Sequence, residues 1–130
     1  MTIAEWMILA AVLIYLLTIA PFKPLGYREF DNAKPRDPAF YEQPLRARAW
    51  GAHLNGIETF PFFAAAVLLA EFRVAPQHLI DLLAVSFVVL RLAFVAAYLL
   101  NYPWIRTLIW NVGFAVNVAI FLLPWWGRQP

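Results

Sequence analysis

Four long apolar stretches divide the chain, and shorter polar segments separate them. They cover about residues 3–21, 46–71, 78–100 and 104–124. Each is close to the roughly 20 residues with which an α-helix crosses the hydrocarbon core of a bilayer. Runs of this length satisfy their own backbone hydrogen bonds in lipid as helices. The pattern therefore predicts an all-α protein, a single membrane domain over residues 1–130 with four spans in a left-handed antiparallel bundle.

Composition agrees with an integral membrane protein. Hydrophobic residues make up 63% of the chain and the mean hydropathy is +0.66, whereas soluble domains contain about 45–50% apolar residues. The first stretch has an alternative interpretation as a signal peptide, but Glu5 and the lack of Lys or Arg before it argue against this. The net charge is only +2 and the basic residues cluster in one segment, so we expect no nucleic-acid partner.

The polar segment over residues 22–45 sets the expected orientation. Most of the basic residues lie in it or at the start of the second span, which places this loop in the cytoplasm by the positive-inside rule. With four spans, both termini then lie outside and the short connection at residues 101–103 is also cytoplasmic. The sequence PRDP at residues 35–38 disfavours regular helix, so we expect an ordered loop lying against the helices.

The second span carries polar side chains at membrane depth. Glu58 lies ten residues beyond Arg48, and Arg91 lies ten residues before Asn101, so both reach a depth of about 15 Å. A lone charge near mid-bilayer is costly. We therefore expect Glu58 and Arg91 to form an ion pair between the second and third spans. The alternative is that such a pair only fixes the register of the two helices.

Face counting at 100° per residue gives the second span two polar sides. Arg48, Asn55 and Glu58 share one sector, and Arg46 and His53 lie nearly opposite. A single subunit hides one such face, and the other would meet lipid unless a second subunit covered it, which predicts an oligomer. His53 alone is interpreted as a hydrogen-bonded interface residue. No carboxylate or second histidine stands at ligand spacing, so no metal site is expected.

On the third span Arg91, Tyr98 and Tyr102 recur at helical spacing, and Arg106 follows at the start of the fourth span. Buried phenols need hydrogen-bond partners, and an arginine beside them could bind a carboxylate or lower the pKa of a ligand thiol. The alternatives are an aromatic packing seam and an Arg106 that reaches the lipid headgroups. Asn117 on the fourth span is expected to make an interhelical hydrogen bond. The chain has no cysteine, so any thiol must come from a ligand.

The run RAxxAHLNxxExFPFFAAAVLLA from Arg48 to Ala70, the PRDP loop before it and the stripe of Arg91, Tyr98 and Arg106 after it resemble the MAPEG family, membrane-associated proteins in eicosanoid and glutathione metabolism, and its bacterial branch in particular. The resemblance implies a homotrimer of four-helix subunits in the bacterial inner membrane. It also implies glutathione bound between neighbouring subunits near the cytoplasmic face, and a lipophilic second substrate that arrives from the membrane lipid.

The resemblance also implies roles for single residues. Asn55 and Glu58 fall on positions associated with glutathione binding, and His53 on a position contributed across the subunit boundary. Tyr98 falls on the second tyrosine of the third-helix motif, and Arg106 on the arginine that activates the glutathione thiol. Together with these, the residues expected to bind glutathione are Arg48, Arg91 and Tyr102.

Two positions depart from the family pattern. Gly51 stands where the eukaryotic transferases have a glutathione-binding arginine, which Arg48 could replace, and Phe94 stands where many members have the first tyrosine. The main hypothesis is a glutathione-dependent transferase or peroxidase in which Arg106 stabilises the thiolate. The alternative is a non-catalytic lipid-binding or scaffolding protein of the same fold. A transporter or channel is less favoured, because the sequence shows no interrupted helix pair and no ring of like charges.

Overall fold

The computed structural model describes residues 1–127. Its elements in chain order are α1 (Ile3–Ile19), α2 (Phe22–Leu25), the 3-10 helix η1 (Pro38–Tyr41), α3 (Pro44–Phe72), α4 (Gln77–Leu99) and α5 (Pro103–Trp126). No strand occurs in this part of the chain, and four helices are long and apolar enough to cross a membrane. The prediction of an all-α, multi-pass membrane protein is confirmed. The predicted domain ran to residue 130, and residues 128–130 lie outside the described part.

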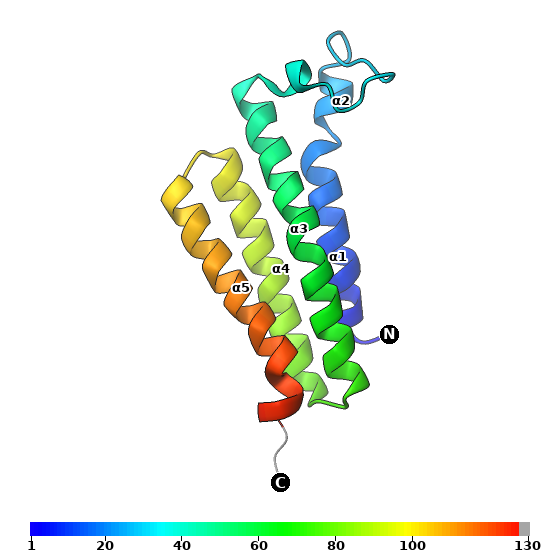
Figure 1. The fold of residues 1–130 in the computed structure, drawn as a ribbon, viewed down its shortest axis with the longest axis vertical. Helices are drawn as coiled ribbons and strands as arrows, with labels where there is room; N and C mark the ends of the chain where they lie inside the picture. The colour runs from blue at the N-terminus through cyan, green and yellow to red at the C-terminus, as the bar shows by residue number, and fades with distance from the viewer. Residues whose placement is uncertain (128–130) are drawn as a thin grey trace.

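The helices lie alongside one another, with both ends of the described chain at one end of the molecule (Figure 1). The connector, residues 20–43, forms the opposite end, which we call the connector end. α3 and α4 pack against each other, and each also packs against α1 and α5. The most deeply buried large side chains are Phe63, Val67, Ile80, Ile120 and Leu123. The core therefore sits between α3, α4 and their two neighbours.

The starts of the long helices follow from their first residues. The Gln43 side chain accepts a hydrogen bond from the Arg46 amide at 3.2 Å, and Pro44 occupies the first helical position. Pro103 likewise begins α5, as the sequence predicted. Before it, Asn101 turns the chain with a φ of 62°, a left-handed conformation that asparagine tolerates. These local signals explain why the predicted second and fourth spans begin within two residues of α3 and α5.

The connector is ordered and folds back on α3. Phe40 and Tyr41 of η1 are buried, and the Tyr41 ring stacks on Trp50 with 4.5 Å between centroids. The Tyr41 hydroxyl donates to the Pro35 carbonyl at 3.0 Å. Burial raises the pKa of this phenol, with a smaller opposing effect of Arg36, so Tyr41 stays protonated and keeps its hydrogen bond. The expected ordered loop against the helices is confirmed.

The second polar face of α3 is covered by the same chain. His53 Nδ1 lies 2.6 Å from the Tyr15 carbonyl oxygen of α1. Arg46 pairs with Glu29 of the connector and donates to the Phe40 carbonyl oxygen at 3.3 Å. The argument that another subunit must cover Arg46 and His53 was therefore wrong. Face counting shows which side of a helix is polar but not which segment covers it, and here α1 and the connector supply the partners.

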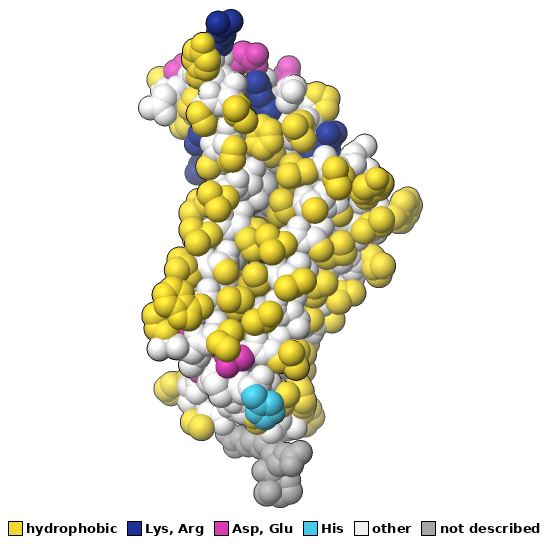
Figure 2. All heavy atoms as spheres, turned by 180° about the vertical axis from the view of Figure 1, so that it is seen from behind, with side chains coloured by type: hydrophobic (Ala, Val, Ile, Leu, Met, Phe, Trp, Pro, Cys, Tyr) yellow, Lys and Arg dark blue, Asp and Glu magenta, His cyan; other side chains and the backbone are white. Residues whose placement is uncertain are grey.

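The middle of the molecule exposes apolar side chains and its connector end exposes basic ones (Figure 2). Leu82, Leu92 and Leu108 are each more than half exposed. A soluble monomer rarely exposes apolar surface so continuously. Contact with lipid accounts for this band.

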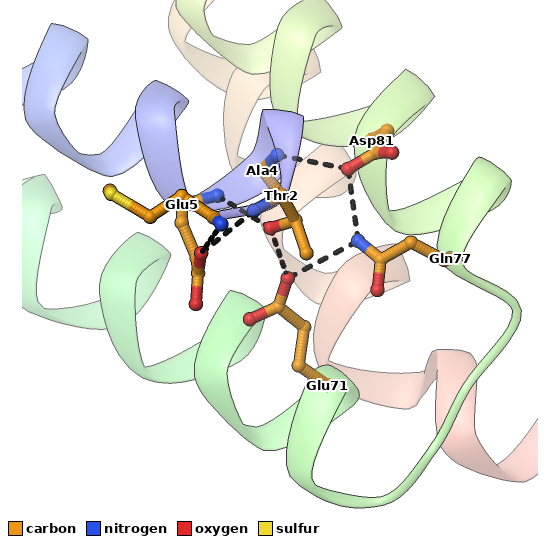
Figure 3. Close-up of polar contacts among 7 residues, drawn as sticks. Thr2, Ala4, Glu5, Glu71, Gln77 and Asp81 are labelled. Atoms are coloured by element: carbon orange, nitrogen blue, oxygen red, sulfur yellow. Dashed lines mark hydrogen bonds and ion pairs between the residues drawn. The ribbon is translucent and has the colours of Figure 1, made fainter.

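Polar side chains clamp three helices together at the end opposite the connector (Figure 3). The Thr2 hydroxyl donates to Glu71 at 2.6 Å, and the Ala4 amide donates to Asp81 at 2.9 Å. Gln77 donates to both carboxylates, at 3.2 Å to Glu71 and 2.9 Å to Asp81. The amide of Ala4 is among those that a helix start leaves without an internal partner, so this clamp satisfies it while fixing α1 to α3 and α4.

We expect Gly56→Ala to destabilise the fold. A Cβ at Gly56 would lie 2.4 Å from the Tyr15 Cβ of α1, so α1 would have to move. Such overpacking costs about 1–3 kcal/mol, against the better helix propensity of alanine. Thermal unfolding in detergent measures the loss. The matched control is Gly113→Ala, whose Cβ would approach Phe87 only to 3.9 Å, and equal melting temperatures for the two variants would contradict the packing argument.

Candidate functional site

A polar crevice lies between α3, α4 and α5 in the half of the bundle nearest the connector end. It has a volume of about 430 Å3 and is lined by Gly51, Asn55, Glu58, Tyr98 and Arg106, with Leu54, Phe94, Thr107 and Trp110. Four of the residues predicted from the sequence, Asn55, Glu58, Tyr98 and Arg106, therefore come together from three helices. We call this space the crevice.

Arg106 is held inside the crevice by an aromatic ring. Its guanidinium carbon lies 4.3 Å from the centroid of the Tyr98 ring, the arrangement of a cation–π contact. The Tyr98 ring in turn meets Phe94 edge to face at 5.6 Å. No carboxylate within residues 1–127 forms an ion pair with Arg106. Its N–H groups are therefore available to an anionic ligand.

Gly51 explains the position of Tyr98. A Cβ at residue 51 would lie 2.3 Å from the Tyr98 hydroxyl oxygen and 2.8 Å from its Cζ. Only glycine lets the phenol lie so close to α3. The absence of an arginine at this position thus has a steric reason, because any side chain at residue 51 would displace the tyrosine over which Arg106 packs.

Arg91 is paired with an amide, which corrects one sequence prediction. Its Nη1 donates to Asn55 Oδ1 at 2.9 Å, and its guanidinium carbon lies 4.3 Å from the Phe94 ring centroid. Arg91 is only 6% exposed, whereas Glu58 is exposed. No ion pair joins Glu58 and Arg91 in the described part of the chain, so that prediction was wrong. Depth counting does not separate residues one turn apart, and Asn55 lies one turn closer to the connector end than Glu58.

Three other candidates lie outside the crevice lining. Arg48 Nε donates to the Leu99 carbonyl oxygen at 3.0 Å and so binds the C-terminal end of α4, where a cation is favoured. Tyr102 precedes α5 and is 54% exposed. His53 stacks on Trp50 on the opposite side of α3. Their predicted roles in glutathione binding stay predictions.

That opposite side of α3 has a space of its own, of about 700 Å3. Its polar lining comes from the connector and from α3, and comprises Lys23, Arg36, Tyr41, Trp50 and His53, with apolar residues of α1 beside them. Sequence reasoning missed Lys23 and Arg36 as site candidates. The only signal for them was the clustering of basic residues in the connector.

A second, inner cavity continues from the crevice into the bundle. It has a volume of about 180 Å3, and Asn55, Glu58, Phe94 and Trp110 line both spaces. Asn117 also belongs to its lining, and the Oδ1 atom of Asn117 is buried and accepts no hydrogen bond within residues 1–127. The predicted interhelical hydrogen bond of Asn117 is therefore wrong for this oxygen. A sequence gives the depth of an asparagine but not its partner.

These observations define a membrane protein of four long helices with a polar crevice, in which Arg106 has no ion pair within residues 1–127. The family model of the MAPEG family matches residues 3–126, which include every candidate residue. The chain belongs to the MAPEG family, whose members generally use glutathione. Comparison with curated proteins and with solved structures found no match.

We expect Asn55→Leu to destabilise the bundle, because it leaves the buried Arg91 without its acceptor. Hydrogen bonds to charged groups contribute about 1.5–3 kcal/mol. In an Arg91→Leu background the same substitution is expected to cost much less, so a double-mutant cycle measures the coupling. Glu58→Gln is the control and is expected to leave stability unchanged. A loss of stability in Glu58→Gln as large as that in Asn55→Leu would instead support an ion pair between Glu58 and Arg91.

We expect Gly51→Ala to be destabilising only while Tyr98 is present. In the natural chain the new methyl group collides with the phenol, at a cost of about 1–3 kcal/mol. In a Tyr98→Ala background the collision is gone and the substitution gains from the helix propensity of alanine. Thermal unfolding of the four proteins of this cycle tests the contact. An equal effect of Gly51→Ala in both backgrounds would refute it.

Proposed function

We propose that this protein is a membrane-bound glutathione-dependent transferase or peroxidase that acts on a lipophilic electrophile, with Arg106 stabilising the glutathione thiolate. The observation that carries the proposal is the crevice, in which three helices of a MAPEG chain bring Asn55, Glu58, Tyr98 and Arg106 together. Glutathione has two carboxylates, one ammonium group and one thiol. In the crevice, the Glu58 carboxylate can pair with the ammonium group and the Arg106 guanidinium with the ionised thiol.

Arg106 is the proposed catalytic residue. Its N–H groups would donate to the sulfur, and a hydrogen bond or positive charge that favours the ionised form lowers the pKa of a thiol. A thiol with a pKa of about 8.5 is only about 3% ionised at pH 7, and a lowering by two units would raise this to about three quarters. No side chain of the protein needs to act as the nucleophile. The Tyr98 ring beneath the guanidinium would keep Arg106 in place.

The remaining charges of glutathione have candidate partners. Glu58 lines the crevice, is exposed and forms no ion pair within the described residues, so it can receive the ammonium group. Arg48 uses only Nε in a hydrogen bond in this part of the chain, which leaves its terminal nitrogens for a carboxylate. Asn55 has an amide nitrogen available beside the oxygen that Arg91 occupies.

The proposal includes a homotrimer with the connector end in the cytoplasm of a bacterial inner membrane. The basic side chains at the connector end support this orientation (Figure 2). The space on the other face of α3, with Lys23, Arg36 and His53 in its lining, would then meet the crevice of the next subunit. Its cations would neutralise the carboxylates of glutathione. In this arrangement the site is complete only in the oligomer.

Both proposed reactions start from the thiolate. In conjugation the sulfur forms a bond to an electrophilic carbon, and the leaving group departs with its electron pair. With a hydroperoxide the sulfur bonds to the terminal oxygen, the O–O bond breaks and the alkoxide takes up a proton. The resulting glutathione sulfenic acid then condenses with a second glutathione thiol, giving the disulfide and water.

We expect Arg106→Ala to keep the assembly but to lose the ultraviolet absorbance of the thiolate when glutathione is added. The reason is that no other cation within residues 1–127 lines the crevice. Arg73→Ala, at the far end of α3, is the matched control and should behave as the unmodified protein. Equal thiolate absorbance in Arg106→Ala would rule out the role of Arg106. A calorimetric titration of the unmodified protein that shows no glutathione binding would favour the alternative, a non-catalytic lipid-binding or scaffolding protein.

A further inference from the structure

The space of about 700 Å3 on the side of α3 opposite the crevice, which we call the connector pocket, is positively charged. Two cations of the connector, Lys23 and Arg36, line it, and neither forms an ion pair within residues 1–127. No carboxylate of the described chain belongs to its lining, whereas Glu58 lines the crevice. The ligand of the connector pocket is therefore expected to carry negative charge.

The charged part of the connector pocket lies at the level of a membrane interface. The Thr2 hydroxyl donates to Glu71, so these two residues mark one level at the far end of the molecule. α2 continues α1 towards the connector end (Figure 1). Lys23 lies 21 residues after Thr2 and Trp50 lies 21 residues before Glu71, which places both about 32 Å from that level. The hydrocarbon core of a bilayer is about 30 Å thick, so Lys23 and Trp50 reach the headgroup region.

The rest of the connector pocket extends into the hydrocarbon. Its apolar lining includes Leu16 of α1 and Ile57 of α3, which are 46% and 44% exposed. Leu16 lies seven residues before Lys23, and Ile57 lies seven residues after Trp50. Each is therefore about 10 Å deeper in the membrane than the interface residue on its own side of the pocket. Apolar side chains at this depth favour an apolar ligand group.

A phospholipid matches both parts of the connector pocket, whereas a soluble anion matches only one. A free phosphate or a peptide carboxylate could pair with the cations, but it would leave Leu16 and Ile57 without an apolar partner. Basic pockets between membrane helices bind the headgroups of anionic lipids. Trp50 in the lining agrees with this depth, because tryptophan is enriched at membrane interfaces.

We propose that the connector pocket binds one anionic phospholipid of the leaflet at the connector end. The headgroup phosphate lies on Lys23 and Arg36, and an acyl chain lies against Leu16 and Ile57. The binding stands on the geometry of the single chain. Its consequence rests on the proposed function, in which the same cations serve the carboxylates of glutathione. The lipid and glutathione then compete for Lys23 and Arg36, so anionic lipid lowers the affinity for glutathione.

Native mass spectrometry of the purified protein in a nonionic detergent tests the lipid site. The probes are phosphatidylglycerol and phosphatidylcholine with the same acyl chains, and the measurement gives the number of bound lipids and the affinity for each. We expect one tightly bound phosphatidylglycerol per chain and weaker binding of phosphatidylcholine. In Lys23→Gln/Arg36→Gln the affinity for phosphatidylglycerol is expected to fall about 25-fold, because each cation near an anionic headgroup contributes about five-fold.

Arg28→Gln/Lys34→Gln is the matched control for this variant. It removes the same charge from the connector, and neither residue lines the connector pocket, so it should bind phosphatidylglycerol as the unmodified protein does. An equal loss in the two double variants, or equal affinities of the unmodified protein for the two lipids, would overturn the proposal. Glycerol 3-phosphate, a soluble headgroup analogue, is expected not to displace the lipid. Displacement at a comparable concentration would assign the pocket to a free phosphate instead.

Ile57→Trp tests the place of the acyl chain. The larger side chain fills the apolar part of the connector pocket and is expected to weaken the binding of both lipids several-fold. Leu68→Trp is the control, because Leu68 is 54% exposed on the same helix and lies outside the lining. Unchanged lipid binding in Ile57→Trp would show that the acyl chain lies elsewhere and would overturn this part of the proposal.

The competition with glutathione has a separate measurement. Glutathione is titrated calorimetrically into the protein in nanodiscs of phosphatidylcholine, with and without phosphatidylglycerol. The anionic lipid is expected to lower the glutathione affinity several-fold in the unmodified protein and in Arg28→Gln/Lys34→Gln. A loss of the same size in Lys23→Gln/Arg36→Gln would refute the competition, because the surface charge of the bilayer would then explain it. Absence of glutathione binding in either bilayer would refute the proposed function instead, and the result of the lipid measurement would stand.

Discussion

A buried guanidinium in the middle of a membrane helix is the constraint on which this structure depends. Arg91 is 6% exposed on α4, and a charge at that depth must find polar partners inside the protein. Asn55 supplies the hydrogen bond and Phe94 the face of an aromatic ring. Because Asn55 lies on α3 and Arg91 on α4, their hydrogen bond ties these two helices together where the crevice meets the inner cavity.

Small residues on α3 determine how closely its neighbours approach. Gly56 admits Tyr15 of α1 on one side, and Gly51 admits Tyr98 of α4 on the other. The second contact matters for the site, because Arg106 packs on the Tyr98 ring. A departure from the family pattern at residue 51 is therefore linked to the position of the proposed catalytic arginine. The Tyr98 ring holds this arginine by a cation–π contact, and no ion pair within residues 1–127 does so.

Charge separates the two sides of α3. The crevice side holds Arg106 and Glu58, neither of which has a charged partner within residues 1–127, and groups left in this way can bind a zwitterionic ligand. On the opposite side the polar groups contact partners within the chain. Arg46 forms an ion pair with Glu29, and His53 Nδ1 lies within hydrogen-bond distance of the Tyr15 carbonyl oxygen. The crevice side of the helix thus keeps charged groups free for a ligand. On the opposite side the proposed function uses only the cations of the connector, Lys23 and Arg36, which line the space there.

The sequence by itself determined the four spans and the start of α5 at Pro103. That Asn55, Glu58, Tyr98 and Arg106 belong together was implied only by the family resemblance, and the tertiary structure places them around one crevice. Hydrophobic length, helix-start signals and depth along a helix are all local properties, and they can be read from a single chain. Only the tertiary structure decided that Arg91 pairs with Asn55 instead of Glu58, that α1 supplies the partner of His53 and the connector that of Arg46, and that Asn117 Oδ1 has no partner within residues 1–127. Those outcomes depend on the rotation of each helix and on side-chain volume across helices, and residues one turn apart have nearly the same depth but different neighbours.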